Sequence, residues 1–455
     1  MGNQLGTARG ADVMSELPKV DSEGEALVFG RVLGGGRFLK TLQCWHDTQM
    51  VVVKAYSKRD AAQSLREYAE RLEGIRERLS GLDHPNVLPF MWFPETPRAA
   101  FLVRAFVHSS LKERVTMRPF LTTLERRWIT FQLLTALEQC QSVGLVHGDI
   151  KSNNMLITSW NWVVLSDLTG LKPGYLPEDN PADLSYFFDD DYHKRCYVAP
   201  ERFYHSSTPE AQRPKEMMTG AIDVFASGCV IAELFLSGEA PFSLAELLAY
   251  RKGQYDAAHR LRQIADADIA ELVGDMIALD PAQRGLPGEY LKRYQSRCFP
   301  LYFGKFLHGF TWRCMNELTP DETIATLWRQ RDAILAALGV PHAEGARRLP
   351  AVDARFAGSI SSSSSASSKS SGSDDEEQDL AVLCADVLGV ADGVPAEGVG
   401  GAKQDCKGVK EAGEEDGRKG QERGVMCEDL VNILVMVTSV MRSVKVLYLF
   451  VRQCM

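Results

Sequence analysis

The stretch Gly144-Leu-Val-His147-Gly-Asp149-Ile-Lys151-Ser-Asn-Asn154, with Asp167 after a second apolar run, decides the fold of this chain. An apolar strand leads into a polar loop, and a second strand, Trp162 to Leu165, precedes Asp167. A turn between two strands also uses Asp and Asn, and for any single residue that interpretation is the simpler one. Chance is a poor explanation for the pattern His-x-Asp-x-Lys-x-x-Asn followed by a strand and an Asp. The stretch therefore predicts a loop built for phosphoryl transfer.

The polar residues of this stretch match the groups that phosphoryl transfer requires. That reaction needs an acceptor for the hydroxyl proton, a cation near the transferred group and ligands for Mg²⁺. We expect Asp149 to orient and deprotonate the attacking hydroxyl, and Lys151 to neutralise charge on the transferred phosphoryl group. Asn154 and Asp167 are expected to hold the metal through hard oxygen ligands.

Two features nearer the N-terminus predict the nucleotide-binding half of the site. Two short strands are joined by a turn at Leu33-Gly34-Gly35-Gly36, where glycines let backbone N–H groups approach phosphate oxygens closely. Hairpin turns use the same residues, so the cluster alone is weak. The strand Met50-Val-Val52-Val-Lys54 follows and ends in a lysine placed to pair with the α- and β-phosphates.

The spacing of Tyr68, Leu72, Ile75 and Leu79 predicts a helix over residues 60–80. Either Glu70 or Glu73 could face Lys54 from this helix. We prefer Glu73, because it lies further along the helix and is followed by the apolar positions that would hold the helix in place. The alternative is an ordinary solvated charge.

The remaining elements of the folded part follow from periodicity and turn signals. A helix is expected from about Leu124 to Ser142, and an irregular segment with the acidic cluster 189–191 lies between Asp167 and Ala199-Pro-Glu201. Short strands are expected around Val87–Phe90 and Ala100–Val103, with Arg104–His108 as the connection between two lobes. Asp223 and Arg284 lie in later helical patterns.

Composition limits the class of protein. The chain has 455 residues, 45% of them hydrophobic, which suggests two or three folded units. A formal net charge of −9 without a long basic cluster argues against nucleic acid as a partner. Its ten cysteines are scattered and show neither a disulfide framework nor a zinc spacing, which fits a reducing, intracellular compartment.

The two ends of the chain have distinct patterns. The start, Met1-Gly2-Asn-Gln-Leu-Gly6-Thr7, places Gly2 where N-myristoylation would occur, but Thr7 is one place late for the consensus. No signal peptide pattern is present in the first thirty residues. Thr319-Pro-Asp-Glu322 is a capping box that predicts a helix to about Leu338. Residues 357–425 are rich in Ser, Gly and Glu and are expected to be a disordered linker.

The last segment is apolar but is interrupted by Arg442 and Lys445 before it reaches the length of a membrane span. We interpret it as a packing helix from a further helical region. The expected organisation is an N-terminal arm 1–26, a folded domain 27–310 (lobes 27–107 and 108–310), a helical extension 311–356, the linker 357–425 and the apolar helix 426–455.

Residues 27–310 resemble the eukaryotic protein-kinase fold, an α+β fold of two lobes. The resemblance rests on the order and spacing of Leu33-Gly-Gly-Gly36, Val-Val-Val-Lys54, His147-Gly-Asp149-Ile-Lys151-Ser-Asn-Asn154, Asp167, Ala199-Pro-Glu201, Asp223 and Arg284. It implies a nucleotide, ATP or another purine nucleoside triphosphate, bound with Mg²⁺ at Leu33, Gly34, Gly36, Val52, Lys54, Glu73 and Leu156. It also implies structural roles for Glu201, Asp223 and Arg284.

Within that fold the chain is similar to the family of myristoylated, vacuolar-sorting regulatory subunits of the class III phosphatidylinositol 3-kinase complex. The runs that carry this likeness include Arg127-Trp-Ile, Thr158-Ser-Trp-Asn-Trp162 and Tyr175-Leu-Pro-Glu-Asp-Asn-Pro-Ala-Asp183. The likeness implies a complex with the lipid kinase and a Beclin-type subunit, peripheral on endosomal, autophagic or vacuolar membranes and facing the cytoplasm. Family members continue into HEAT repeats, and the apolar helix at 426–455 resembles the start of that region.

Several positions depart from the ordinary kinase pattern. Leu39 replaces the third glycine, and Val52 takes the position of a small alanine, which narrows the purine slot and leaves the choice of nucleotide open. Gly148 replaces the arginine that usually binds a phosphate on the activation segment. We therefore expect that segment to be ordered by its own packing, through Tyr186, Phe187 and Phe188.

Two classes of function are consistent with these residues. One is a serine/threonine-kinase-like subunit with low or restricted phosphotransfer, which regulates and anchors a lipid kinase. The other is a pseudokinase scaffold in the same complex, in which nucleotide stabilises the domain and no phosphate is transferred. Each predicts a bound nucleotide, and only a measurement of phosphate transfer separates them.

Overall fold

The computed structural model describes residues 27–319 apart from residues 35, 59, 61–63, 169–170, 189–190 and 215–216, together with residues 16–18 and Glu322. The chain divides into two compact units, Met1–Trp312 and Arg313–Met455. All of the candidate site lies in the first unit.

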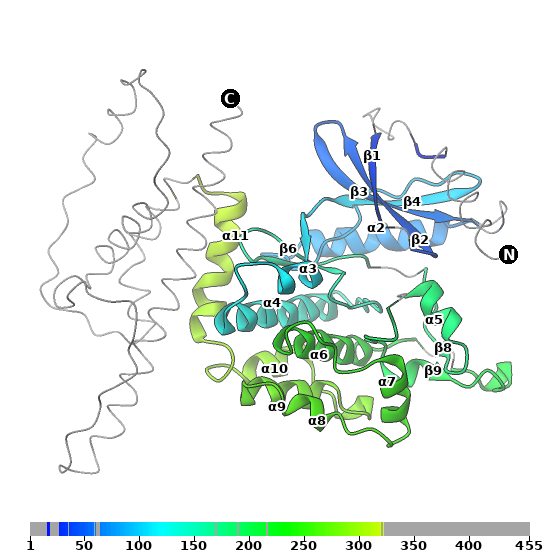
Figure 1. The fold of residues 1–455 in the computed structure, drawn as a ribbon. Coiled ribbons are helices and arrows are strands. Elements are labelled where there is room, and N and C mark those ends of the chain that lie inside the picture. Colours follow the sequence, from blue (N-terminus) through cyan, green and yellow to red (C-terminus); the bar gives the residue numbers. More distant parts are fainter. Residues whose placement is uncertain are drawn as a thin grey trace, which may run out of the picture. The chain divides into compact units, whose positions relative to one another are not determined.

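The smaller lobe is an antiparallel sheet in the order β1 (Leu27–Gly34), β2 (Leu39–His46), β3 (Gln49–Ser57) and β4 (Ala99–Ala105). Helix α2 (Arg66–Ser80) lies alongside this sheet (Figure 1). Because successive side chains of a strand point to opposite faces, Val51, Val53 and Val103 enter one buried cluster, whereas Lys54 and Arg104 belong to the opposite face. That opposite face carries the polar side chains discussed below.

The second lobe is mainly helical and is built around α4 (Thr123–Ser142) and α6 (Ala221–Phe235). Helix α6 is buried from Ile222 to Leu234, so other elements cover it on every side. A small sheet of β5 (Ser109–Ser110), β6 (Met155–Ile157) and β7 (Val163–Leu165) lies on this lobe. The further helices and strands are α3 (Leu111–Thr116), β8 (Leu176–Pro177), α5 (Pro181–Phe187), β9 (Phe203–Tyr204), α7 (Leu244–Arg251), α8 (Ala258–Leu261), α9 (Ala267–Met276), α10 (Pro287–Arg293) and α11 (His308–Asn316).

Local sequence signals account for the start of α4. The Thr122 hydroxyl accepts from the Glu125 backbone N–H at 3.2 Å, and the Glu125 carboxylate accepts from the Thr122 backbone N–H at 2.8 Å. This capping box satisfies backbone donors that the helix cannot satisfy itself. The observed helix agrees with the one predicted from about Leu124 to Ser142, and the two-lobed α+β fold is confirmed.

Two predictions about the small lobe are wrong. Val87–Phe90 is not a strand of the sheet, because Val87 forms an isolated bridge with Leu165 of the other lobe. The interlobe connection expected at Arg104–His108 is wrong in its start, because β4 extends through Ala105 with Arg104 paired to Val52, and residues 106–108 then lead to β5. Both differences arise from pairing with distant strands, which local periodicity does not report.

Some predictions concern residues beyond the described part. The arm 1–26 apart from residues 16–18, the linker 357–425 and the apolar helix 426–455 lie outside it, as does the helix expected to end near Leu338. The capping box is present: the Thr319 backbone N–H and hydroxyl each donate to Glu322 at 2.8 Å. Of the helices that are described, none combines the length and the apolar character needed to cross a bilayer.

Candidate active site

A cavity of about 390 Å³ lies against the polar face of the small sheet. The glycine turn between β1 and β2 contributes one wall, and the loop between α4 and β6 contributes the other. Its volume falls in the usual range for small-molecule sites. The predicted residues that line it are Leu33, Gly34, Gly36, Lys54, Asp149, Lys151, Asn154 and Asp167.

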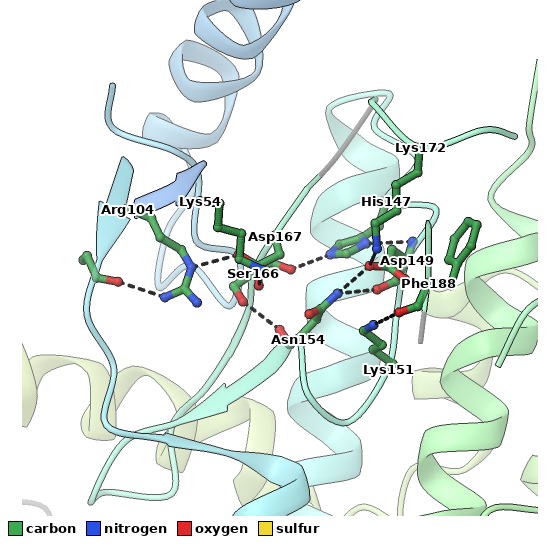
Figure 2. Close-up of polar contacts among 11 residues, drawn as sticks. Lys54, Arg104, His147, Asp149, Lys151, Asn154, Ser166, Asp167, Lys172 and Phe188 are labelled. Carbon is green, nitrogen blue, oxygen red and sulfur yellow. Dashed lines mark hydrogen bonds and ion pairs between the residues drawn. The ribbon is translucent and has the colours of Figure 1, made fainter. Parts of the chain in front are cut away.

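Two cations from the small sheet hold Asp167, as Figure 2 shows. Lys54 Nζ lies 2.5 Å from one carboxylate oxygen, and Arg104 Nε donates to the other at 2.9 Å. All three side chains are buried or nearly so. The Asp167 backbone has a φ of +67°, a value that residues other than glycine seldom adopt. The ion pairs with Lys54 and Arg104 therefore also help to hold a strained residue.

Burial and neighbouring charges shift the pKa values of Asp167 and Lys54. Burial alone would raise the pKa of Asp167, but Lys54 and Arg104 outweigh it and hold that pKa well below its ordinary value. Burial lowers the pKa of Lys54, and Asp167 only partly opposes this effect. Asp167 is therefore ionised at any physiological pH.

Asp149 is also engaged by a cation. Lys172 Nζ lies 2.5 Å from Asp149 Oδ2, and Asn154 Nδ2 donates to the same oxygen at 2.9 Å. Despite burial, Lys151 and Lys172 hold the pKa of Asp149 below its ordinary value. Burial lowers the pKa of Lys172 to about 8, with Asp149 opposing the shift. The carboxylate is ionised, as a proton acceptor must be.

A buried carboxylate, that of Asp223, binds the backbone of the loop that carries Asp149. Asp223 of α6 accepts from the backbone N–H groups of His147 at 2.7 Å and Gly148 at 2.8 Å. His147 Nε2 lies 2.9 Å from the Ser166 carbonyl oxygen, which joins the loop to the residue before Asp167. Gly148 has a φ of +76°, a conformation that a side chain would strain.

The segment after Asp167 returns over the cavity and is held at Phe188. Lys151 Nζ donates to the Phe188 carbonyl oxygen, and the Phe188 ring lies 4.9 Å from the cations of both Lys172 and Arg202. Arg202 is buried and donates to three carbonyl oxygens, those of Gly148 at 2.7 Å, Gly174 at 2.6 Å and Pro173 at 3.0 Å. Arg202, which directly follows Ala-Pro-Glu201, thus supplies a cation beside Gly148.

Comparison with known proteins shows which family has this fold and site. The family model of the protein kinase domain matches residues 27–293. This chain belongs to the protein kinase family. A serine/threonine-protein kinase VPS15 of Arabidopsis thaliana is 46% identical over 300 residues, which are 66% of this chain and 20% of that protein. A probable VPS15 kinase of Dictyostelium discoideum is 41% identical over 333 residues, 73% of this chain and 17% of that protein.

A third relative, serine/threonine-protein kinase VPS15 of Saccharomyces cerevisiae, is 37% identical over 281 residues, covering 61% of this chain and 19% of that protein. This chain therefore spans about a fifth of the length of these relatives. The predicted resemblance to vacuolar-sorting kinase subunits is confirmed at the level of the kinase region.

Further contacts lie where a kinase domain uses them to support its activation segment. Arg284 forms a two-point pair with Glu201, at 2.7 and 3.0 Å, and its Nη1 also donates to the Ala221 carbonyl oxygen at 2.9 Å. The Arg284 guanidinium lies 4.9 Å from the centre of the Phe225 ring. These contacts join the end of the activation segment to the start of α6.

The expected pairing of Lys54 with Glu73 is wrong. Glu73 pairs with Arg76 one turn along α2 and is half exposed, and Glu70 pairs with Arg66 at the surface. Helix α2 buries Leu72, Ile75 and Leu79, which turns both glutamates away from the sheet. Lys54 takes Asp167 as its partner instead.

Two predicted wall residues do not line this cavity. Val52 and Leu156 are buried, at 2% and 5% exposure, but neither contributes to the cavity surface. Val52 lies opposite Arg104 on the neighbouring strand. The cavity is therefore bounded mainly by the residues expected to contact phosphate, and the purine contacts of Val52 and Leu156 stay predictions.

Sequence reasoning missed Arg104, Lys172 and Arg202. Arg104 left a signal, because it is a charged residue in the otherwise apolar strand Ala99–Ala105. Lys172 and Arg202 left none, since isolated basic residues in irregular segments are usually solvated. Their roles depend on contacts with residues that are 23 and 54 positions away in sequence.

The residue types present fit a magnesium site. Asp167 and Asn154 offer a carboxylate and an amide, the hard oxygen donors that Mg²⁺ prefers. Both Asp167 oxygens already face cations, so a metal would share them with Lys54 and Arg104. In the part of the chain that the structure describes, no cluster of three or more His, Cys, Asp or Glu side chains suggests another metal site.

Proposed function

We propose that this chain is the serine/threonine-kinase-like regulatory subunit of a class III phosphatidylinositol 3-kinase complex, and that it binds a purine nucleoside triphosphate in the cavity. The single observation that carries the nucleotide assignment is the meeting of Lys54, Asp149, Asn154 and Asp167 around one cavity under a glycine turn. The complex is inferred from the likeness to VPS15 kinases over the kinase region.

The chain's own residues would act as follows. Gly34 and Gly36 would present backbone N–H groups to the phosphates, and Lys54 would pair with the phosphate oxygens. Asp149 would orient the acceptor hydroxyl and take its proton. Bound Mg²⁺, held by Asn154 and Asp167, would neutralise charge that develops on the phosphates.

A second candidate is a silent scaffold in the same complex. It is favoured by the 2.5 Å pair between Lys172 and Asp149, because a neighbouring cation makes a carboxylate a weaker acceptor for the hydroxyl proton. The half-exposed position of Glu73 adds to this, since active kinases pair their β3 lysine with a glutamate of the neighbouring helix. In this scaffold, nucleotide would stabilise the domain for its partners.

The likeness also supports partners and a location. We propose that the lipid kinase and a Beclin-type subunit bind this chain, and that an acyl group on Gly2 attaches it to endosomal, autophagic or vacuolar membranes. A single myristoyl chain binds a bilayer only marginally, so partner subunits would supply a second contact.

Single-turnover transfer of the γ-phosphate separates the two candidates. The purified complex would contain a lipid kinase inactivated at its own site, so that this chain is the only source of transfer. We expect Asp149→Asn to reduce transfer about 100-fold or more, because a positioned base contributes about 10²–10⁴ to the rate. Nucleotide binding, measured in parallel, should change by less than about threefold, since the substitution keeps the size of the side chain.

Equal, background-level transfer by the wild type and Asp149→Asn would instead establish the scaffold. The matched control is Asp183→Asn, which makes the same change in α5 of the activation segment, at a residue that does not line the cavity. This control should transfer phosphate at the wild-type rate.

A further inference from the structure

Arg104 occupies an unusual place for an arginine. It lies on β4 opposite Val52 and two residues from Leu102, the partner of Lys54, so the pleat of the sheet directs Arg104 and Lys54 to the same face. Only 5% of its surface is exposed, and it lines the cavity. Its Nη1 donates to the Ala105 carbonyl oxygen at 3.1 Å, which holds the guanidinium against the strand (Figure 2).

The cavity is consequently rich in fixed positive charge. Two carboxylates, Asp149 and Asp167, line it together with five cationic side chains: Arg37, Lys54, Arg104, Lys151 and Lys172. The carboxylates are the groups that would attract a divalent cation. Each is already within 2.9 Å of at least one cationic nitrogen of the chain itself.

We propose that Arg104 binds nucleotide as a resident cation, so that this site takes a nucleoside triphosphate without requiring a divalent metal. Kinases use Mg²⁺ to neutralise adjacent phosphates and to connect them to the aspartate at this position. Here Arg104 and Lys54 already neutralise Asp167, and together with Lys151 they leave excess positive charge for the phosphates.

The choice of arginine is physically reasonable for this role. A guanidinium stays charged when buried and presents several donors in a fixed plane, so one edge can bind Asp167 while other donors bind phosphate. In a site of low dielectric constant, such a charge acts more strongly than it would at the surface. A neutral side chain of similar length would lack both properties.

This inference rests on the nucleotide binding put forward above. The test measures the dissociation constants of ATP and GTP for the full chain by isothermal titration calorimetry, in Mg²⁺ and in EDTA. We expect removal of Mg²⁺ to weaken wild-type binding by less than about threefold. Arg104→Met should bind at least about 10-fold more weakly in EDTA and recover most of that loss in Mg²⁺, because the metal then replaces the missing charge.

Two further variants keep the result interpretable. Arg104→Lys retains the charge and should keep metal-independent binding. Arg66→Met makes the same change as Arg104→Met at an exposed arginine of the same lobe, and it should behave as the wild type. Thermal unfolding without nucleotide identifies folded variants, and if Arg104→Met does not fold, the wild type and Arg104→Lys decide the matter.

The outcomes distinguish this inference from the proposed function. Wild-type binding that is lost in EDTA overturns the role of Arg104 but leaves the nucleotide site intact. Equal EDTA sensitivity of the wild type and a folded Arg104→Met also overturns it and assigns Arg104 a purely structural role. Absence of binding by the wild type in both conditions overturns the inference and the nucleotide assignment together.

Discussion

The protonation of Lys172 controls an ion pair with the candidate catalytic residue Asp149. Lys172 comes from the segment after Asp167, is buried, and pairs with Asp149 at 2.5 Å. Burial disfavours its charged form strongly enough to lower its pKa to about 8, although Asp149 opposes that shift. The ion pair on the candidate catalytic aspartate therefore weakens just above neutral pH.

This shift predicts a pH dependence of stability. An unfolded lysine titrates near 10.4, so between about pH 8 and 10 the unfolded chain binds more protons at Lys172 than the native chain does. The free energy of unfolding should rise with pH over that window. Relative to Lys172→Met, the wild type should gain about 2 kcal/mol between pH 8 and 10, as measured by urea unfolding.

The control for this prediction is Lys194→Met, the same substitution at an exposed lysine in a neighbouring segment. It should follow the wild-type profile across the window. A constant difference between the wild type and Lys172→Met from pH 7 to 10 would show that Lys172 does not titrate there.

At the scale of elements, aromatic rings and an arginine pack against the activation segment. Phe38 of the glycine turn lies 5.8 Å from the Tyr186 ring and 5.0 Å from the Phe187 ring at the end of α5. The Phe188 ring lies 4.9 Å from the cations of both Lys172 and Arg202. These contacts agree with the expectation that Tyr186, Phe187 and Phe188 order the segment, although Asp189 and Asp190 lie outside the described residues.

Arg202 should accordingly control the order of this segment. Arg202→Met removes donors to three carbonyl oxygens and leaves those oxygens without their cation. We expect amide hydrogen exchange across residues 171–188 to accelerate about 10-fold or more, because the lost bonds involve a charged donor and are worth over 1.4 kcal/mol together. Arg213→Met, at a more exposed arginine, is the control.

The same measurement tests how the segment is regulated. Phosphatase treatment of the purified complex should leave exchange across residues 171–188 unchanged, since Gly148 provides no arginine to bind a phosphate. Added nucleotide should slow exchange, because Lys151 and Phe188 both line the cavity. If dephosphorylation alone released the segment, packing would not be what orders it.

At the scale of the whole molecule, the kinase domain accounts for residues 27–293 of the chain. The chain spans about a fifth of the relatives that it matches, and its N-terminus lies outside the described residues. Under the proposed function, attachment to membranes would depend on an acyl group at Gly2 and on partner subunits.

Gly2→Ala tests that attachment. It should abolish incorporation of labelled myristate and reduce the membrane-bound fraction of the chain, whereas Gly6→Ala should change neither. Residual membrane binding by Gly2→Ala in the intact complex, lost when the partner subunits are removed, would be the contribution of those subunits. Unchanged labelling and fractionation of Gly2→Ala would place the anchor elsewhere.

The sequence by itself determined the two-lobed fold and the cavity residues expected to take part in phosphoryl transfer. Asp149, Asn154 and Asp167 could be predicted because they belong to one short strand–loop–strand unit, in which spacing along the chain sets position in space. Lys54 could be predicted because a lysine in a β-branched strand after a glycine turn has few other uses, although β3 continues past it to Ser57.

Only the tertiary structure decided which cations face which carboxylates. Arg104 and Asp167 are 63 residues apart, and Glu73 was the nearer choice for Lys54 by motif. The burial of Leu72, Ile75 and Leu79 rotated α2 so that Glu73 faced solvent, and strand pairing then brought Arg104 beside Lys54. Packing of apolar side chains sets such rotations, and the polar contacts follow from them, so no local pattern reports which charges will meet.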